Sequence, residues 1–209
     1  MDKQAILIGY SGHAYVLIEI LYNNNCQILG YCDNAPVSEN PYGLTFLGNE
    51  SNQETVKVLK CNNVYLAIGD NKIRSSLYKQ LAVEKEITFP NLLHQRSIIS
   101  SSVNIGNASV VMQGAVINAQ ASIGIASIIN TSAIIEHNCV VGDYSHIAPG
   151  VVLTGNVTVG NYTFVGANSV VKQGVKIGSN VIVGAGSVVL RDIADGLTVY
   201  GNPALVKSI

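Results

Sequence analysis

A six-residue repeat in the second half of the chain limits its fold more than any other feature. Counted in sixes, all sixteen first positions are aliphatic: Ile99, Ile105, Val111, Ile117, Ile123, Ile129, Ile135, Val141, Ile147, Leu153, Val159, Val165, Val171, Ile177, Val183 and Val189. With aliphatic residues at roughly a third of positions, such a run has odds on the order of one in ten million by chance. No insertion interrupts the register between residues 99 and 194.

A period of six fits a short strand, a turn and a new strand at an angle, so that one aliphatic side chain of each hexad points at a common axis. Three hexads close one coil, and successive coils stack about 4.8 Å apart, as neighbours in a parallel ladder do. The sequence therefore predicts about five coils of a parallel β-helix with a triangular section. Small residues at the fifth position fit its tight corners, and Gly or Asn near the corners accepts positive φ.

Charged residues are scarce, and they are scarcest in the repeat. Lys and Arg total 12 and Asp and Glu total 13 among 209 residues, but only six of these charges lie between residues 99 and 194. Outward positions there are apolar as well: Val110, Val116, Ile128, Ile134, Val140, Val152 and Phe164. We therefore expect another chain to cover part of the prism.

The same composition excludes several classes of partner. Without a basic run, we expect no nucleic-acid partner, and no stretch approaches the ~20 apolar residues of a membrane span. The first residues lack the features of a signal peptide, which favours a cytoplasmic protein. Cys26, Cys32, Cys61 and Cys139 form neither a C-x-x-C motif nor a disulfide framework, so we expect free thiols.

The first ninety residues alternate between strand and helix patterns. Apolar runs at 5–8, 26–32 and 63–68 read as strands, and helical patterns occupy 16–21, 50–60 and 72–85. This order predicts a Rossmann-like α/β domain with a small parallel sheet over residues 1–92, followed by the all-β domain over 93–209. Ligands of such sheets bind at the carboxyl ends of the strands.

A glycine turn, Gly9 to Ala14, follows the first predicted strand. It lacks a full dinucleotide fingerprint because Ser11 occupies the second glycine position. It still suits a phosphate at a helix N-terminus, where Ser11 and His13 add donors. Asp33 lies 24 residues after Gly9, where an acid often meets a ribose. The alternative is that all of these are only turn and cap residues.

Two histidines of the repeat are candidates for chemistry. His137 occupies a third position and His146 a sixth position at a corner, both outside the predicted core, whereas His94 lies on the connector. A neutral imidazole on a rigid β surface can remove a proton from an amine or a hydroxyl. A zinc hydratase on this fold needs three histidine ligands and the repeat has two, so we expect no metal. Either histidine alone could also be an ordinary surface residue.

An ordered set of motifs carries a resemblance over nearly the whole chain. They are Gly9-x-Ser11-Gly12-His13, Asp33-Asn34, Ala67-Ile68-Gly69-Asp70-Asn71 with Arg74, Asn91-Leu92-Leu93-His94, Asn130-Thr131, Glu136-His137, Gly142-Asp143, His146-Ile147-Ala148-Pro149 and Gly201-Asn202-Pro203-Ala204. Together they resemble the hexapeptide-repeat sugar acetyltransferases of the sialic acid O-acetyltransferase and UDP-4-amino-sugar (bacillosamine) N-acetyltransferase group. That resemblance implies a left-handed β-helix and a homotrimer with cofactor clefts between the prisms.

The resemblance also implies acetyl-CoA as donor, a nucleotide-linked amino sugar of the UDP-4-amino-sugar type as acceptor, and a role in bacterial surface glycan synthesis. By position, His137 would be the general base and the backbone N–H of Gly155 the donor to the acetyl oxygen. The remaining roles follow in the same way. The acetyl-CoA site would contain Asn130, His146, Gly155, Ala167, Ala185, Gly201, Asn202 and Pro203, and the sugar-nucleotide site would contain Ser11, Gly12, His13, Asp33, Asn34 and Gly69.

One residue departs from the family pattern. The residue after the base is usually Asp or Glu, and here it is Asn138. A neutral amide can orient the imidazole but cannot stabilise its charged form, a difference of about 1–2 kcal/mol. A less demanding acceptor or a slower enzyme is therefore one interpretation. O-acetylation of a sialic acid or related sugar stays open as an alternative activity, and so does a non-catalytic nucleotide-sugar-binding protein. Serine acetyltransferases and nucleotidyltransferase fusions share the prism but lack the small N-terminal sheet.

Overall fold

A computed structural model describes residues 4–207 and divides the chain into two compact units between Leu92 and Leu93. Residues 1–3 and 208–209, at the outer ends of the two predicted domains, lie outside the described part.

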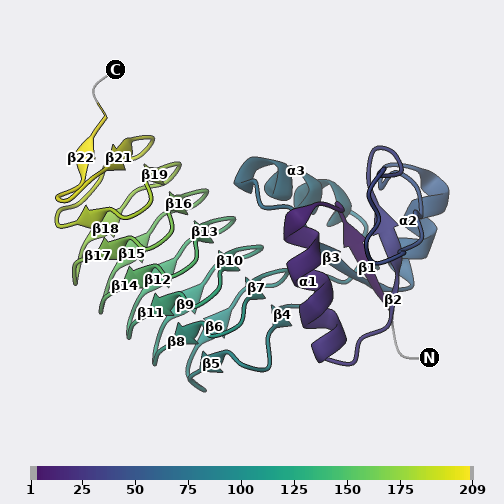
Figure 1. Ribbon diagram of the computed structural model, residues 1–209, viewed down its shortest axis with the longest axis horizontal. Helices are drawn as coiled ribbons and strands as arrows, with labels where there is room; N and C mark the ends of the chain where they lie inside the picture. The colour runs from purple at the N-terminus through teal and green to yellow at the C-terminus, as the bar shows by residue number, and fades with distance from the viewer. Residues whose placement is uncertain (1–3, 208–209) are drawn as a thin grey trace. The chain divides into compact units, whose positions relative to one another are not determined.

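The first unit is the predicted α/β sheet. Its three strands run parallel in the order β2-β1-β3, and the elements are β1 (Ala5–Ile8), α1 (Gly12–Asn23), β2 (Ile28–Cys32), α2 (Gln53–Lys60), β3 (Asn63–Leu66) and α3 (Asn71–Leu81) (Figure 1). The alternation is confirmed, with β2, β3, α2 and α3 shorter than predicted and α1 longer. The central strand β1 is buried along its whole length, as a strand covered on both faces must be.

Aromatic stacking fixes the long segment that leaves β2. The ring of Tyr10 stacks on Tyr31 with centroids 4.4 Å apart, and the Tyr10 hydroxyl donates to Oδ1 of Asn40 at 2.7 Å. Tyr15 packs against Tyr42 in the same cluster. Because these contacts join α1, β2 and the segment after it, that segment has one defined course before α2 begins.

The second unit is a β-helix whose parallel strands form three faces (Figure 1). The first face contains β4 (Leu92–Leu93), β7 (Val110–Val111), β10 (Ile128–Ile129), β13 (His146–Ile147), β16 (Phe164–Val165), β19 (Ile182–Val183) and β21 (Thr198–Tyr200), with β22 (Leu205–Val206) antiparallel to β21. The second face contains β5 (Ile98–Ile99), β8 (Val116–Ile117), β11 (Ile134–Ile135), β14 (Val152–Leu153), β17 (Val170–Val171) and β20 (Val188–Val189). The third face contains β6 (Asn104–Ile105), β9 (Ser122–Ile123), β12 (Val140–Val141), β15 (Thr158–Val159) and β18 (Lys176–Ile177).

The register follows the predicted period of three hexads. Ile129 pairs with Ile147, and Ile135 pairs with Leu153. The β-helix makes about six coils instead of five, because β4 adds a strand before the counted repeat and β21 adds one after it. The final coil is shorter, since Val183 pairs with Val199 only 16 residues later.

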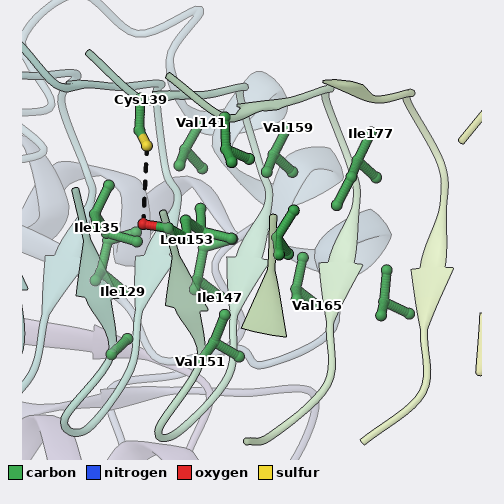
Figure 2. Packing of buried hydrophobic residues seen from close by; sticks show 14 of the residues in the cluster. Ile129, Ile135, Cys139, Val141, Ile147, Val151, Leu153, Val159, Val165 and Ile177 are labelled. Atoms are coloured by element: carbon green, nitrogen blue, oxygen red, sulfur yellow. Dashed lines mark hydrogen bonds between the residues drawn. The ribbon is translucent and has the colours of Figure 1, made fainter. Parts of the chain in front are cut away.

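The first residues of the hexads build the core, as predicted. From Val111 to Val189 every one of them is buried, and Figure 2 shows these side chains stacked coil upon coil along the axis. The Cys139 thiol also points inward, where its Sγ lies 3.2 Å from the carbonyl oxygen of Thr154. All four cysteines are free, as predicted.

A column of buried hydroxyls joins the coils at the corner that precedes the first face. Oγ of Ser145 donates to the carbonyl of Gly160 at 2.7 Å and accepts from the N–H of Thr163 at 3.1 Å. Ser109, Ser127 and Thr163 repeat this pattern in their own coils. Fifth-position residues at this corner are therefore selected for a hydroxyl as well as for small size.

The fourth position of the hexad takes a left-handed backbone at nearly every corner. Asn138 has φ of 60°, Asn156 59° and Asn168 56°, and Gly114 and Gly150 adopt the same region. Asn and Gly populate it at lowest cost, which explains their frequency there. The corner itself thus favours Asn at position 138.

The hydroxyl column gives a stability prediction. In Ser145→Ala the carbonyl of Gly160 and the N–H of Thr163 lose their buried partner, so we expect the free energy of unfolding to fall by about 1–3 kcal/mol. Ser145→Thr keeps the hydroxyl that Thr163 already presents in this column, and should cost much less. Urea unfolding followed by circular dichroism measures both, and equal losses would show that the hydroxyl contributes nothing.

Candidate active site

His137 lies on the turn after β11, at the corner between the second and third faces. Its side chain is exposed to solvent, but its ring lies directly over Gly155, one coil further along. A Cβ added to Gly155 would be 2.7 Å from both Cε1 and Nε2 of His137. Only glycine at position 155 leaves room for the imidazole in this place.

Asn138 fixes the protonation pattern of the imidazole. Nδ1 of His137 lies 3.0 Å from Oδ1 of Asn138. An amide oxygen only accepts, so Nδ1 carries the proton and Nε2 presents its lone pair. Glu136 reaches the backbone instead: its Oε2 accepts from the N–H of His137 at 3.4 Å. The nitrogen next to Gly155 is therefore the one that can take up a proton.

The backbone at Gly155 has its own chemical capacity. Its carbonyl accepts from the N–H of Gly174, whereas its N–H donates to no other residue in the described range 4–207. The N–H of Gly155 and Nε2 of His137 thus lie side by side. The N–H can stabilise a developing negative charge, and Nε2 can accept a proton.

Asn130 and His146 form a second polar pair on the first face. Nδ2 of Asn130 donates to Nε2 of His146 at 3.0 Å, and the ring of His146 packs edge-on against Phe164 with centroids 5.1 Å apart. The prediction of a corner position for His146 was wrong, since it is the first residue of β13 and is only 8% exposed. The position of a residue within its hexad does not determine how exposed its side chain is.

The other residues assigned to the acetyl-CoA site follow the corner between the first and second faces. Ala167 and Ala185 stack in successive coils, where the carbonyl of Ala167 accepts from the N–H of Gly186. Gly201, Asn202 and Pro203 form the exposed turn between β21 and β22, and the carbonyl of Gly201 accepts from the N–H of Val188. Asn130 is the first residue of the same corner in its own coil. These residues of the predicted acetyl-CoA site therefore lie along a different edge of the prism from His137.

In the first unit the glycine turn leads into α1 as predicted. Ser11 is the N-cap residue, but its side chain makes no capping hydrogen bond and both Ser11 and Gly12 are exposed. Gly9 has φ of 89°, and a Cβ there would overlap Ile68, which lies just after β3. The turn therefore presents a hydroxyl and backbone N–H groups outward at the positive end of a helix.

Asp33 and Asn34 follow β2 beside this turn. Oδ2 of Asp33 accepts from the N–H of Tyr10 at 3.2 Å, and Oδ1 accepts from the N–H of Asn34 at 2.7 Å. The carboxylate is held at the strand end by two backbone donors. Its oxygens keep lone pairs for further donors such as hydroxyls.

A buried arginine supports the turn that contains Gly69. Nη1 of Arg74 donates to the carbonyls of Ile68 and Gly69, both at 3.0 Å, and Nη2 donates to Oδ1 of Asn71 at 2.8 Å. Arg74 is 1% exposed, and burial lowers its pKa to about 10, so it stays charged at neutral pH. Its role was not predicted, because nothing in the sequence distinguishes a buried arginine from a surface one on a helix.

His13 lies near this arginine. Burial, and then the positive charge of Arg74, lower the pKa of His13 to about 4. The imidazole is therefore neutral at pH 7, and it can serve an anion as a hydrogen-bond donor but not as a cation.

The ends of the strands enclose a pocket of about 290 Å³. Its lining includes Gly9, Asp33 and Asn34, which the sequence predicted, and Glu50, which it did not. Glu50 lies in an irregular segment without a motif, so only the folded course of that segment places it here.

Known family models match segments in both units. Residues 4–81 match the PglD N-terminal domain, residues 132–161 the hexapeptide repeat of succinyl-transferase, and residues 156–191 the bacterial transferase hexapeptide. No curated protein matches the chain.

Solved structures match over the full length. A histidine variant of perosamine N-acetyltransferase from Caulobacter crescentus, in complex with CoA and GDP-perosamine, is 33% identical with a TM-score of 0.93, covering 100% of this chain and 99% of that one. The acetyltransferase domain of PglB from Neisseria gonorrhoeae, in complex with acetyl coenzyme A, is 30% identical with a TM-score of 0.91, covering 99% and 100%. The chain therefore belongs to the hexapeptide-repeat sugar acetyltransferases, acetyl-CoA-dependent enzymes with a PglD-type N-terminal domain and a left-handed β-helix.

Residues 4–207 contain no group of three His, Cys, Asp or Glu side chains that could hold a metal ion. No helix in that range has the length and apolar character needed to cross a membrane.

The lowered pKa of His13 predicts how stability depends on pH. The unfolded chain binds a proton near pH 6.5 and the folded chain only near 4, so the stabilisation is complete above 6.5 and is lost as the pH falls toward 4. The loss should approach about 3 kcal/mol. Urea unfolding followed by tyrosine fluorescence at both ends of this window measures it. His13→Asn should lose clearly less over the same window, and an equal loss would contradict the burial of a neutral imidazole.

Proposed function

We propose that this enzyme transfers an acetyl group from acetyl-CoA to the amine of a nucleotide-linked amino sugar, for surface glycan synthesis. The observation that carries the proposal is the place of Nε2 of His137 over Gly155, beside a backbone N–H that is free within the described chain. The two full-length relatives, whose complexes contain CoA or acetyl-CoA and in one case a nucleotide amino sugar, support it.

The residues divide the work of one acyl transfer. The amine nitrogen attacks the thioester carbonyl carbon, and Nε2 of His137 accepts the proton that the amine loses. The N–H of Gly155 donates to the carbonyl oxygen while negative charge develops there. The C–S bond then breaks, CoA leaves as the thiolate, and the proton held by His137 can pass to it. Asn138 keeps Nδ1 protonated, so that the same nitrogen of the ring serves throughout.

The sugar nucleotide belongs to the first unit in this proposal. Ser11, Gly12 and the neutral His13 offer donors to a phosphate at the N-terminus of α1. Asp33 retains acceptor capacity for ribose hydroxyls, with Asn34 beside it, and Gly69 lies on the turn that Arg74 holds. The resemblance alone leaves open which nucleotide is used, because one full-length relative binds a GDP-sugar.

The acetyl-CoA residues imply a second copy of the chain. His137 and Gly155 lie at the corner between the second and third faces, and Asn130, Ala167 and Ala185 lie along the corner between the first and second. One prism cannot bring two of its own edges together, whereas prisms packed side by side can. We therefore propose a homotrimer whose acetyl-transfer sites lie between prisms, with His137 from one chain and Asn130 and His146 from its neighbour.

The outer surface of the prism supports this assembly. Apolar side chains are exposed on all three faces, at Phe164 and Ile182, at Val170 and at Val140. Of the outward residues named from the sequence, Val110 and Ile128 are already buried in the single chain, so the area left for a neighbour is smaller than expected. Sedimentation should show a trimer at micromolar concentration, and a stable monomer would contradict it. Acetyl-CoA and nucleotide sugars are cytoplasmic metabolites, so we place the reaction in the cytoplasm.

The proposed function is tested by incubating the protein with acetyl-CoA and a panel of UDP- and GDP-linked amino sugars. Release of CoA, together with the mass gain of one acetyl group on one sugar, is the expected result. Treating that product with mild base distinguishes N-acetylation from O-acetylation, because base cleaves the ester of an O-acetyl sugar but leaves the amide of an N-acetyl sugar intact. A non-catalytic binding protein would bind a nucleotide sugar and release no CoA.

Two variants test the assigned base. His137→Ala should lower kcat/KM by about a hundredfold or more with the fold intact. Asn138→Asp supplies the missing carboxylate, and we expect kcat/KM to rise about ten- to thirtyfold because the imidazolium is stabilised. Wild-type turnover in a folded His137→Ala protein would reject His137 as base. If kcat/KM of Asn138→Asp does not rise at any pH, the claim that the neutral amide of Asn138 limits catalysis is wrong.

A further inference from the structure

Glu50 is a largely buried residue whose carboxylate the proposed reaction does not use. It is 8% exposed and lines the pocket at the carboxyl ends of the strands. Within residues 4–207 it forms no ion pair and accepts no hydrogen bond. Its oxygens are not among the fully enclosed side-chain atoms, so they remain open to the pocket and can accept hydrogen bonds from a ligand there.

The rest of the pocket suits a mostly apolar ligand with one polar edge. Ile8, Ile68, Ile73 and Leu77 supply its apolar lining, and Asp33 and Asn34 are its polar neighbours. Its volume of about 290 Å³ falls at the lower end of ligand pockets, about 300–1,000 Å³, which fits a nucleobase better than a whole nucleotide sugar.

The carboxylate of Glu50 lies close to the end of β2. Burial raises the pKa of the Cys32 thiol to about 12, and the negative charges of Glu50 and Asp33 add to that effect. Glu50 and Asp33 therefore act on the same part of the pocket. Asp33 lies where an acidic residue often binds the ribose, so the carboxylate of Glu50 is left to bind the nucleobase.

We propose that Glu50 selects guanine as the base of the sugar nucleotide. This inference rests on the proposed function and names the nucleotide that it left open. A carboxylate with two accepting oxygens is complementary to two adjacent donors. Guanine presents N1–H beside its N2 amino group, whereas uracil has one N–H between two carbonyls, and adenine and cytosine each have one amino group beside an accepting nitrogen. Guanine alone satisfies both oxygens, so the substrate is a GDP-linked sugar and not the UDP-linked sugar that the sequence resemblance implies.

Calorimetric titration of the full-length protein with GDP, UDP and inosine diphosphate tests the proposal. Inosine diphosphate lacks only the N2 amino group of guanine. Because a hydrogen bond to a charged group is worth about tenfold to a hundredfold in affinity, GDP should bind tighter than either of the others by about that factor. This comparison needs no variant, so it does not depend on the folding of a mutant.

Glu50→Gln should remove the preference. We expect GDP affinity to fall about tenfold or more until it matches that of inosine diphosphate, with UDP affinity unchanged. Glu54→Gln is the matched control, because Glu54 is an exposed residue of α2 paired with Lys57, and it should leave all three affinities as they are.

Three results would overturn the proposal. UDP binding as tightly as GDP would do so, as would equal binding of GDP and inosine diphosphate. A Glu50→Gln variant that weakens GDP and UDP alike would assign Glu50 to the ribose instead. In each case nucleotide binding and acetyl transfer would still stand, whereas failure of all three nucleotides to bind would count against the proposed function and the guanine assignment together.

Discussion

The length of one coil is the constraint on which the rest of the β-helix depends. Each residue of the repeat lies over the residue three hexads later, because parallel hydrogen bonds join the coils in that register. The core aliphatics stack in this way, and so do the buried hydroxyls of Ser145 and Thr163. The same register carries His137 onto Gly155. The candidate catalytic pair is therefore a consequence of the period that also builds the core.

The corner adds a second requirement that reaches the same site. Position 138 has a left-handed backbone with φ of 60°, which Asn adopts readily. The amide that suits the corner also holds Nδ1 of His137. Asn138 thus adopts the left-handed conformation that the corner requires and also accepts the hydrogen bond from the imidazole. A carboxylate there would add charge stabilisation of the protonated ring.

Most of the fold could be predicted from the sequence, because a strict period leaves few ways to bury sixteen aliphatic side chains. The corner conformations and the stacking of position 137 on position 155 follow from that period as well. The burial of His146 could not be predicted, since the same sixth position is exposed at Phe164. Glu50 was missed for a related reason: it lies in an irregular segment, and an earlier part of that segment is held through Asn40 by Tyr10, 30 residues away in the sequence. Periodicity predicts regular structure, whereas such sites arise from long-range packing of irregular segments.

We propose that acetyl transfer takes place between two chains, because one prism places His137 and His146 at different parts of its coil. Mixing His137→Ala, which lacks the proposed base, with His146→Ala, which lacks a residue of the proposed acetyl-CoA site, tests this arrangement. If the chains exchange at random in a cyclic trimer, about a quarter of the sites combine the intact His137 of one chain with the intact His146 of its neighbour. The mixture should then recover about a quarter of wild-type kcat/KM, with mixed trimers verified by native mass spectrometry. A mixed trimer no more active than its two parents would contradict the account.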